Sequence, residues 1–188
     1  MNFILHPDRG GAQRTDADIV GVRFPYREEL GWTERPLVDH PVFARSPYVE
    51  LVIAEVKSAR DYCQINGPWT DPQRGNMAYV LRALGVFPGD RVNAIAKELY
   101  ARYLYSDDTH RVRLLAFGER RNSDLHPAIV QMTWATDVLP FVYDRFKRHV
   151  SQKSQNEQWD ETGRALFRYA VAARGLGEFS DQVLRGVS

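Results

Sequence analysis

The chain contains little cysteine and no long apolar segment. Its 188 residues include one cysteine, Cys63, which excludes an intrachain disulfide and leaves no cysteine cluster for zinc. The apolar stretch at residues 1–4 is too short for a secretory signal, and no apolar run approaches the roughly 20 residues of a membrane-spanning helix. These absences predict a cytoplasmic protein with no membrane partner.

Net charge and metal-ligand spacing are also nearly absent. The formal net charge is +1, so an anionic partner would have to be held by a local patch or by a metal. The five histidines lack the His-x-x-x-His spacing of a helical zinc site. With 44% hydrophobic and 26% charged residues, the composition is that of an ordinary globular protein. The length predicts a single domain over residues 1–188.

The most informative stretch is the apolar run at residues 48–58, which ends in opposite charges. Its β-branched residues, which follow Pro47, predict a strand. Side chains alternate along a strand, so both faces are expected to be apolar, as in a central strand. Glu55 and Lys57 share one face, where charged groups are rarely buried unless they pair or bind a metal. The simplest alternative is a solvated Glu-Lys pair of little energetic weight. The two expected faces are Leu51, Ile53, Glu55 and Lys57 on one side, and Val52, Ala54 and Val56 on the other.

A second strand is predicted from Asp18 to Phe24, where Pro25 stops it. Asp18 is the first residue on the apolar face of this strand. Asp16, two residues earlier, would lie on the same face and is an alternative to Asp18. Residues 111–117 and 128–134 also have strand composition. Residues 1–15 are expected to form an irregular arm, with residues 2–5 as an edge strand.

Helices are predicted after the Glu55 strand and in the last third of the chain. One spans about residues 72–84, capped by Thr70 or Asp71 and ended by Gly85, and the next spans about 90–103. A later helix should be capped by Thr136 or Asp137, with Pro140 in its first turn. The final helix should bury Trp159, Leu166, Phe167, Ala170 and Val171, and Gly175 and Gly177 should end it before a short tail.

This order predicts an α/β fold with a mixed sheet flanked by helices. Its parts are the N-terminal arm (1–15), a sheet core (18–134) and C-terminal helices (136–188). If the strands that carry Asp18 and Glu55 are neighbours, they gather Asp18, Glu55 and Lys57 into one cluster.

Asp18, followed by Glu55-Val56-Lys57 on the next long strand, resembles the motif of the PD-(D/E)XK superfamily, the restriction-endonuclease-like nucleases. The resemblance covers about residues 18–117 and implies a restriction-endonuclease-like sheet flanked by helices. The family usually places a helix before the Asp strand, whereas the residues before Asp18 look irregular. The glutamine-and-tyrosine helix signature of its exonuclease branch is absent.

The resemblance implies a Mg²⁺ or Mn²⁺ site made by Asp18, Glu55 and the carbonyl of Val56, with Lys57 as the catalytic cation. Mg²⁺ prefers oxygen ligands and keeps several waters, so such a small protein shell is sufficient. Lys57 could orient the attacking water or neutralise developing charge. Gln64 or Asn66 could bind the phosphate or a metal-bound water, although turn residues often bond local backbone instead. Arg145 and Arg148 form a candidate phosphate-contact stripe on a helix, whose alternative is a solvated helix face.

The sequence thus favours a divalent-metal-dependent endonuclease that hydrolyses phosphodiester bonds, with DNA as the expected nucleic acid. A homodimer is expected from the resemblance, because two strands must be cut. The alternative is a catalytically inactive nuclease-fold protein that acts as a nucleic-acid-binding or assembly subunit, which the near-zero net charge favours. A third interpretation is an unrelated fold in which Glu55-Val56-Lys57 is accidental.

Overall fold

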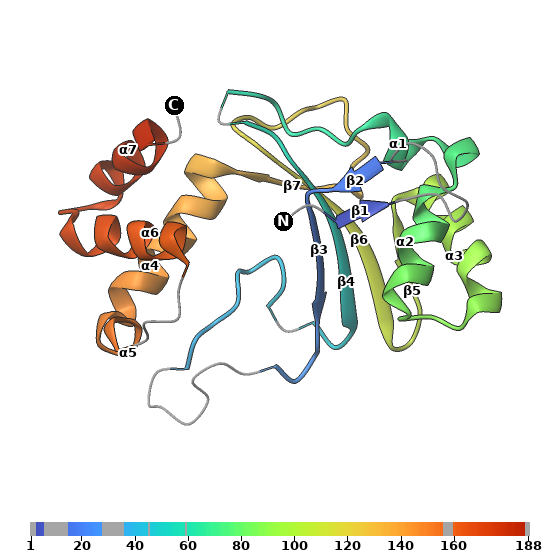
Figure 1. Ribbon diagram of the computed structural model, residues 1–188, viewed down its shortest axis with the longest axis horizontal. Coiled ribbons are helices and arrows are strands. Elements are labelled where there is room, and N and C mark those ends of the chain that lie inside the picture. The colour runs from blue at the N-terminus through green and yellow to red at the C-terminus, as the bar shows by residue number, and fades with distance from the viewer. Residues whose placement is uncertain are drawn as a thin grey trace.

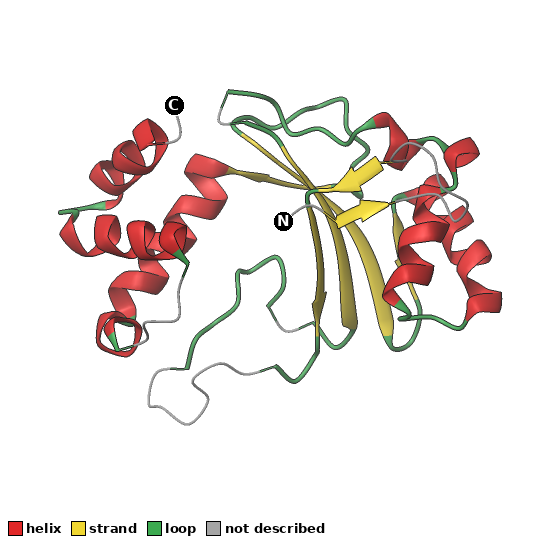
Figure 2. Cartoon of the chain, in the orientation of Figure 1, coloured by secondary structure: helices red, strands yellow, loops and turns green. Residues whose placement is uncertain are grey.

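Residues 3–5, 15–27, 36–44, 46–58, 60–155 and 160–186 are described by the structure, a computed structural model. Within them the chain forms an α/β fold, in which helices flank a mixed five-stranded sheet and the C-terminal part is helical (Figures 1 and 2). This confirms the predicted fold class at that level. No helix among these residues is long and apolar enough to cross a membrane.

The sheet has three parallel strands in its described part. β4 pairs with β6 and β6 with β7 in parallel, while β3 lies antiparallel to β4, and β5 antiparallel to β6. The carboxyl ends of β4, β6 and β7 therefore meet at one edge of the sheet, and β3 begins at that edge. The strands are β3 (Ile19–Arg23), β4 (Val49–Val56), β5 (Leu104–Ser106), β6 (His110–Gly118) and β7 (Val130–Thr133).

A strand is found where residues 2–5 were predicted to form an edge strand. β1 (Phe3–Leu5) pairs with β2 (Thr15–Ala17) in a separate two-stranded sheet, so it is not an edge of the main sheet. Asn2 lies outside the described residues.

The two faces of β4 bury different cores, as the alternation predicted. Leu51 and Ile53 pack with α2 (Asn76–Leu84) and α3 (Gly89–Arg102). Val52 and Ala54 face the other way, toward Leu115 and Met132. We call the first the α2/α3 face and the second the α4 face, after the helices that lie on each side in Figure 1.

The predicted helix at 72–84 is divided in the structure. A short helix α1 (Gly67–Thr70) and a 3-10 turn η1 (Pro72–Arg74) precede α2. Asp71 does cap, but it caps the 3-10 turn by accepting a hydrogen bond from the Gln73 N–H. Gly75 follows in the left-handed region (φ 66°), so a continuous helix was the wrong prediction. The predicted end of the helix at Gly85 (φ 64°) is confirmed by the end of α2.

The cap predicted for the helix that contains Pro140 is also wrong. A π-helical turn, η2 (Trp134–Val138), precedes α4 (Leu139–Arg148), so Val138 takes the cap position without a side-chain hydrogen bond. Asp137 points back to the Thr133 N–H instead. Pro140 lies in the first turn of α4, as predicted.

Three further helices follow: α5 (Val150–Ser154), α6 (Glu161–Ala172) and α7 (Leu176–Gly186). The predicted tail is thus the helix α7, which buries Phe179 against Ala170 and Leu139. Ala170 is buried as predicted, but Val171 is 43% exposed, so its predicted burial is wrong. Trp159 lies outside the described residues.

Candidate active site

Asp18 and Glu55 lie at the sheet edge where β4, β6 and β7 end. The antiparallel register pairs Ile19 with Ala54, so Asp18 comes opposite the end of β4. Its Oδ2 accepts a hydrogen bond from the Val56 N–H (2.7 Å). In open α/β sheets, ligands commonly bind beyond the carboxyl ends of the strands, which is where these residues lie.

Glu55, Lys57 and Asn66 form a closed hydrogen-bonded triangle. Glu55 Oε2 accepts from Asn66 Nδ2 (2.8 Å) and lies 3.3 Å from the Lys57 ammonium. Lys57 Nζ also donates to Asn66 Oδ1 (2.7 Å). The Glu55 side chain is only 3% exposed and that of Lys57 is 20% exposed, so the triangle reaches solvent on its Lys57 side.

The second oxygen of Glu55 lacks such support. Oε1 is buried and has no hydrogen-bond partner among the described residues. Burial raises the pKa of Glu55 above its ordinary value, and the nearby Asp18 carboxylate adds to this rise. Lys57 opposes it, and so, more weakly, does a side-chain hydrogen bond with Trp69. Lys57 and Asn66 both bind Oε2, so neither of these bonds reaches Oε1.

The Val56 carbonyl points toward the side of β4 on which Asp18 lies. The N–H and C=O of one strand residue point toward the same neighbouring strand, and the Val56 N–H points to Asp18. The Lys57 N–H correspondingly points the other way, to the Phe117 carbonyl (2.9 Å). Asp18 Oδ1 makes none of the hydrogen bonds found in the described part of the chain. Two carboxylates and one carbonyl thus supply oxygens of the kind that Mg²⁺ and Mn²⁺ prefer.

This donor set is sparse. Over the described ranges, no group of three or more His, Cys, Asp or Glu side chains is arranged to hold a metal ion. A divalent cation at Asp18 and Glu55 would therefore need water or a substrate oxygen to complete its shell.

Asn66 reaches the site from the N-cap position of α1. An asparagine at this position usually bonds the first N–H groups of its helix, but the Asn66 side chain makes no cap hydrogen bond. It binds Glu55 and Lys57 instead. Helix α1 therefore positions the backbone of Asn66, and the Asn66 side chain is available to bind Glu55 and Lys57.

The other sequence-predicted site residues lie apart from this group. Gln64 is exposed and is not one of the triangle's partners. Arg145 lines a cavity with Val52 and Ala54, which places it on the α4 face, opposite to Glu55. Arg148 is paired with Asp144 on the surface of α4 (2.7 Å). The structure thus brings together Asp18, Glu55, Val56, Lys57 and Asn66, and it does not bring Arg145 or Arg148 to them.

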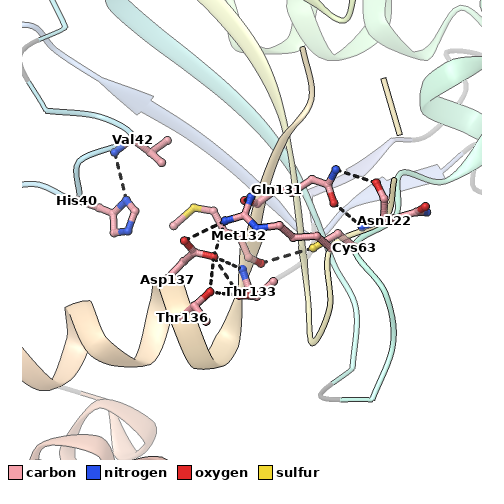
Figure 3. A network of polar contacts seen from close by, with 10 residues as sticks. His40, Val42, Cys63, Asn122, Gln131, Met132, Thr133, Thr136 and Asp137 are labelled. Carbon is pink, nitrogen blue, oxygen red and sulfur yellow. Dashed lines mark hydrogen bonds and ion pairs between the residues drawn. The ribbon is translucent and has the colours of Figure 1, made fainter. Parts of the chain in front are cut away.

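The junction between β7 and α4 is fixed by a polar network. Asp137 accepts from the Thr133 N–H (2.7 Å) and hydroxyl (3.0 Å), and Thr136 also contacts it (Figure 3). Arg121 pairs with the same carboxylate (3.1 Å). Burial alone would raise the pKa of Asp137, but the hydrogen bonds from Thr133 and the charge of Arg121 lower it below its ordinary value.

The sequence analysis missed a buried ion pair on the α4 face. Glu50 is fully buried, and Arg113, Arg111 and Ser46 all bind its carboxylate. A signal for this pair existed, because Glu50 has the parity of Val52 on β4, and Arg113 lies opposite Val52 on β6. Trp69, buried near Glu55, was also missed, because its place depends on how α1 packs.

Comparison of the chain with known protein families, with curated proteins and with solved structures found no match. The fold and the geometry of this site are thus the observations that support a function.

Proposed function

We propose that this protein is a divalent-metal-dependent nuclease of the restriction-endonuclease-like type, which hydrolyses phosphodiester bonds in DNA. The observation that carries the proposal is Glu55 Oε1, a buried carboxylate oxygen without a hydrogen bond in the described structure, beside Asp18 and the Val56 carbonyl. The antiparallel strands that carry Asp18 and Glu55-Val56-Lys57 support it as well. Since one site cuts one strand, we propose a homodimer for cleavage of both.

A divalent cation fits the needs of this site. An unpaired buried acceptor costs about 1–3 kcal/mol, and more when it is charged. Asp18 also repels Glu55. One Mg²⁺ or Mn²⁺ held by Asp18, Glu55 and the Val56 carbonyl would relieve both penalties. When bound, such an ion supplies charge stabilisation at the phosphate and lowers the pKa of a bound water.

Lys57 and Asn66 have roles of their own in this proposal. The Lys57 ammonium has three N–H groups, and in the described structure it directs two of them to Glu55 and Asn66. The third is left for a phosphate oxygen or the attacking water. Asn66 orients Lys57, so the positive charge is in place before substrate binds.

The test combines metal binding with cleavage of plasmid, linear duplex and single-stranded DNA. With Mn²⁺ the wild-type protein should cut at least one substrate, and a chelator should stop the reaction. Glu55→Gln should lose Mn²⁺ binding by calorimetry and lose cleavage, because it removes the negative charge of one of the two carboxylate ligands. Lys57→Met should keep Mn²⁺ binding and lose cleavage by on the order of 10²-fold or more, because it removes a preorganised charge.

Gln64→Ala is the matched control, since Gln64 is exposed and only two residues from Asn66 in the sequence but is not part of the triangle. It should keep both properties. Mn²⁺ binding that depends on Glu55, with no cleavage of any nucleic acid, would support the inactive binding or assembly subunit instead. A wild-type protein that binds no divalent cation, alone or with DNA, would refute the proposal.

A further inference from the structure

The α4 face of the sheet carries an open cavity that plays no part in the proposed nuclease site. Its volume is about 450 Å³, and it lies between the sheet, the 36–44 connection and α4. In Figure 1 this is the side of the sheet that faces the C-terminal helices. The residues that shape it are mainly apolar and include Val52, Ala54, Leu115, Phe117, Phe43 and Phe141.

Small residues on the strands create this space. Gly21 lies in the middle of β3 and lines the cavity, and a Cβ added there would have no atom within 4 Å. Ala54 lines it from β4. Protein interiors are normally close-packed, whereas a cavity of several hundred Å³ has the size of a small-molecule site.

His40 lines the cavity and makes two contacts. The His40 ring accepts a hydrogen bond from the Val42 N–H at Nδ1 (3.2 Å; Figure 3) and packs edge-on against Phe141. This contact joins the 36–44 connection to α4 across the cavity. A ligand would therefore meet a preformed apolar wall, which reduces the entropy lost on binding.

Positive charge is in excess at the border of the cavity. Arg23 and Arg27 both line it, and both bind the same carboxylate, that of Asp39 (2.7 and 2.8 Å). The Arg23 side chain is 15% exposed, and its Nη1 is buried without a hydrogen-bond partner among the described residues. A guanidinium N–H in this state is best satisfied by an anion, and Arg binds carboxylates in a planar geometry.

We propose that this cavity binds a small apolar carboxylic acid, of the size of a medium-chain fatty acid. Its chain packs against Val52, Ala54 and Phe141, and its carboxylate accepts from Nη1 of Arg23. The apolar wall selects the body of the ligand and the unpaired guanidinium nitrogen selects its head group. The proposal requires no metal and no nucleic acid, so it stands or fails independently of the nuclease.

The probes are decanoate, decanol and acetate, each titrated calorimetrically into the full chain without metal or DNA. Decanoate should bind. Decanol should bind more weakly than decanoate, by roughly tenfold or more, because it cannot satisfy the Arg23 charge. Acetate should not bind measurably, because it lacks the apolar body. Decyl phosphate tests the head group: stronger binding than that of decanoate would contradict the assignment to a carboxylate.

Two variants test the two halves of the proposal. Gly21→Val adds an isopropyl group that takes up part of the cavity, and its Cβ meets no atom within 4 Å, so it should lower decanoate affinity roughly tenfold or more while the protein stays folded. Arg23→Met should remove the preference for decanoate over decanol, and Asp39 keeps Arg27 as its partner. Gly89→Ala is the control, since its Cβ also enters open space but at the start of α3.

A folded Gly21→Val protein with unchanged decanoate affinity would overturn the proposal, as would equal affinities for decanoate and decanol in the wild type. The absence of binding, together with a dimer that Gly21→Val disrupts in sedimentation equilibrium, would also overturn it. That result would identify the α4 face as an interface between two copies of the chain.

Discussion

Glu55 is a carboxylate at a position where burial opposes its charge. Because burial raises its folded-state pKa above the unfolded value, the folded state binds the proton more tightly than the unfolded state. The contribution of Glu55 to the free energy of unfolding is therefore fully present below the unfolded pKa. It is lost as the pH rises through the raised folded pKa. Above the raised pKa and without metal, the ionised Glu55 carboxylate therefore lowers the free energy of unfolding.

Glu55→Gln should remove this penalty. The amide still offers an oxygen to Lys57 and Asn66, and it carries no charge to desolvate or to repel Asp18. Without metal, the variant should melt higher than the wild type by roughly 2–4 °C at about pH 8. The difference should shrink toward the unfolded pKa of about 4.5. Melting followed by circular dichroism over this pH range measures it.

Mn²⁺ should reverse the order, because it binds only the protein that retains both carboxylates and so stabilises the folded wild type. Glu98→Gln is a control, since Glu98 pairs with Arg102 on the surface of α3 and is not among the groups that shift the pKa of Glu55. A Glu55→Gln variant that melts below the wild type at high pH without metal would show that the bonds from Lys57 and Asn66 outweigh the cost of burial.

At the scale of an element, the end of β6 approaches the 61–63 segment so closely that only glycine fits. A Cβ on Gly118 would lie 2.6 Å from the Cys63 nitrogen and 2.8 Å from the Tyr62 carbonyl carbon. This approach allows two backbone hydrogen bonds, from Glu119 to Asp61 (2.7 Å) and from Cys63 to Arg120 (2.8 Å). The segment thus fixed leads directly to Asn66.

Gly118→Ala should therefore affect both stability and the site. The atoms that the added methyl group meets are backbone atoms, which cannot rotate away, so we expect a loss of about 1–3 kcal/mol in unfolding free energy. Cleavage should fall as well, because displacement of the segment weakens the hold of Asn66 on Lys57. Urea denaturation and a cleavage assay on the same preparation measure the two effects.

Gly89→Ala again serves as the control, since its Cβ meets no atom within 4 Å. A Gly118→Ala protein of unchanged stability would mean that the 61–63 segment moves away at no cost. Unchanged cleavage with reduced stability would mean that Asn66 is positioned by α1 alone.

Periodicity accounts for what the sequence could predict at this scale. The two faces of β4 follow from the period of two, which also places Glu55 and Lys57 on one face. The start of α2 was predicted at about residue 72, which is too early. Asp71 and Gly75 both favour a turn, and α2 begins only after them. Gly175 and Gly177 suggested a tail, yet burial of Phe179 outweighs the low helix propensity of glycine and forms α7.

Only part of the site could be predicted from the sequence, for a similar reason. Asp18 and Glu55 are brought close by the pairing of β3 with β4, which their strand patterns suggested. Choosing Asn66 over Gln64 depends on the packing of α1 and of the 61–63 segment, which has no sequence period. The face of the sheet that α4 covers is set by tertiary packing, so the distance of Arg145 from Glu55 was not predictable either.

At the scale of the whole molecule, the formal net charge of +1 means that DNA must be held by local cations and by metal. Two surface regions compete for this role, one with Arg120 and the other with Arg145 and Arg148. Arg120 follows the end of β6, its carbonyl accepts from the Cys63 N–H, and its guanidinium is 4.4 Å from the ring centroid of the exposed Tyr62. Arg145 and Arg148 lie on α4, on the opposite side of the sheet.

We expect DNA to contact Arg120, because the end of β6 lies at the sheet edge that carries Asp18 and Glu55. Arg120→Gln should weaken binding of a fluorescent duplex and reduce the slope of log affinity against log salt by roughly 1, as expected for one lost phosphate contact. Arg145→Gln with Arg148→Gln should change neither. Anisotropy titrations with Ca²⁺ in place of Mg²⁺, over a range of salt, measure both quantities. If the α4 variant loses affinity and Arg120→Gln does not, DNA crosses the α4 face, and the Glu55 cluster is not where its backbone is cut.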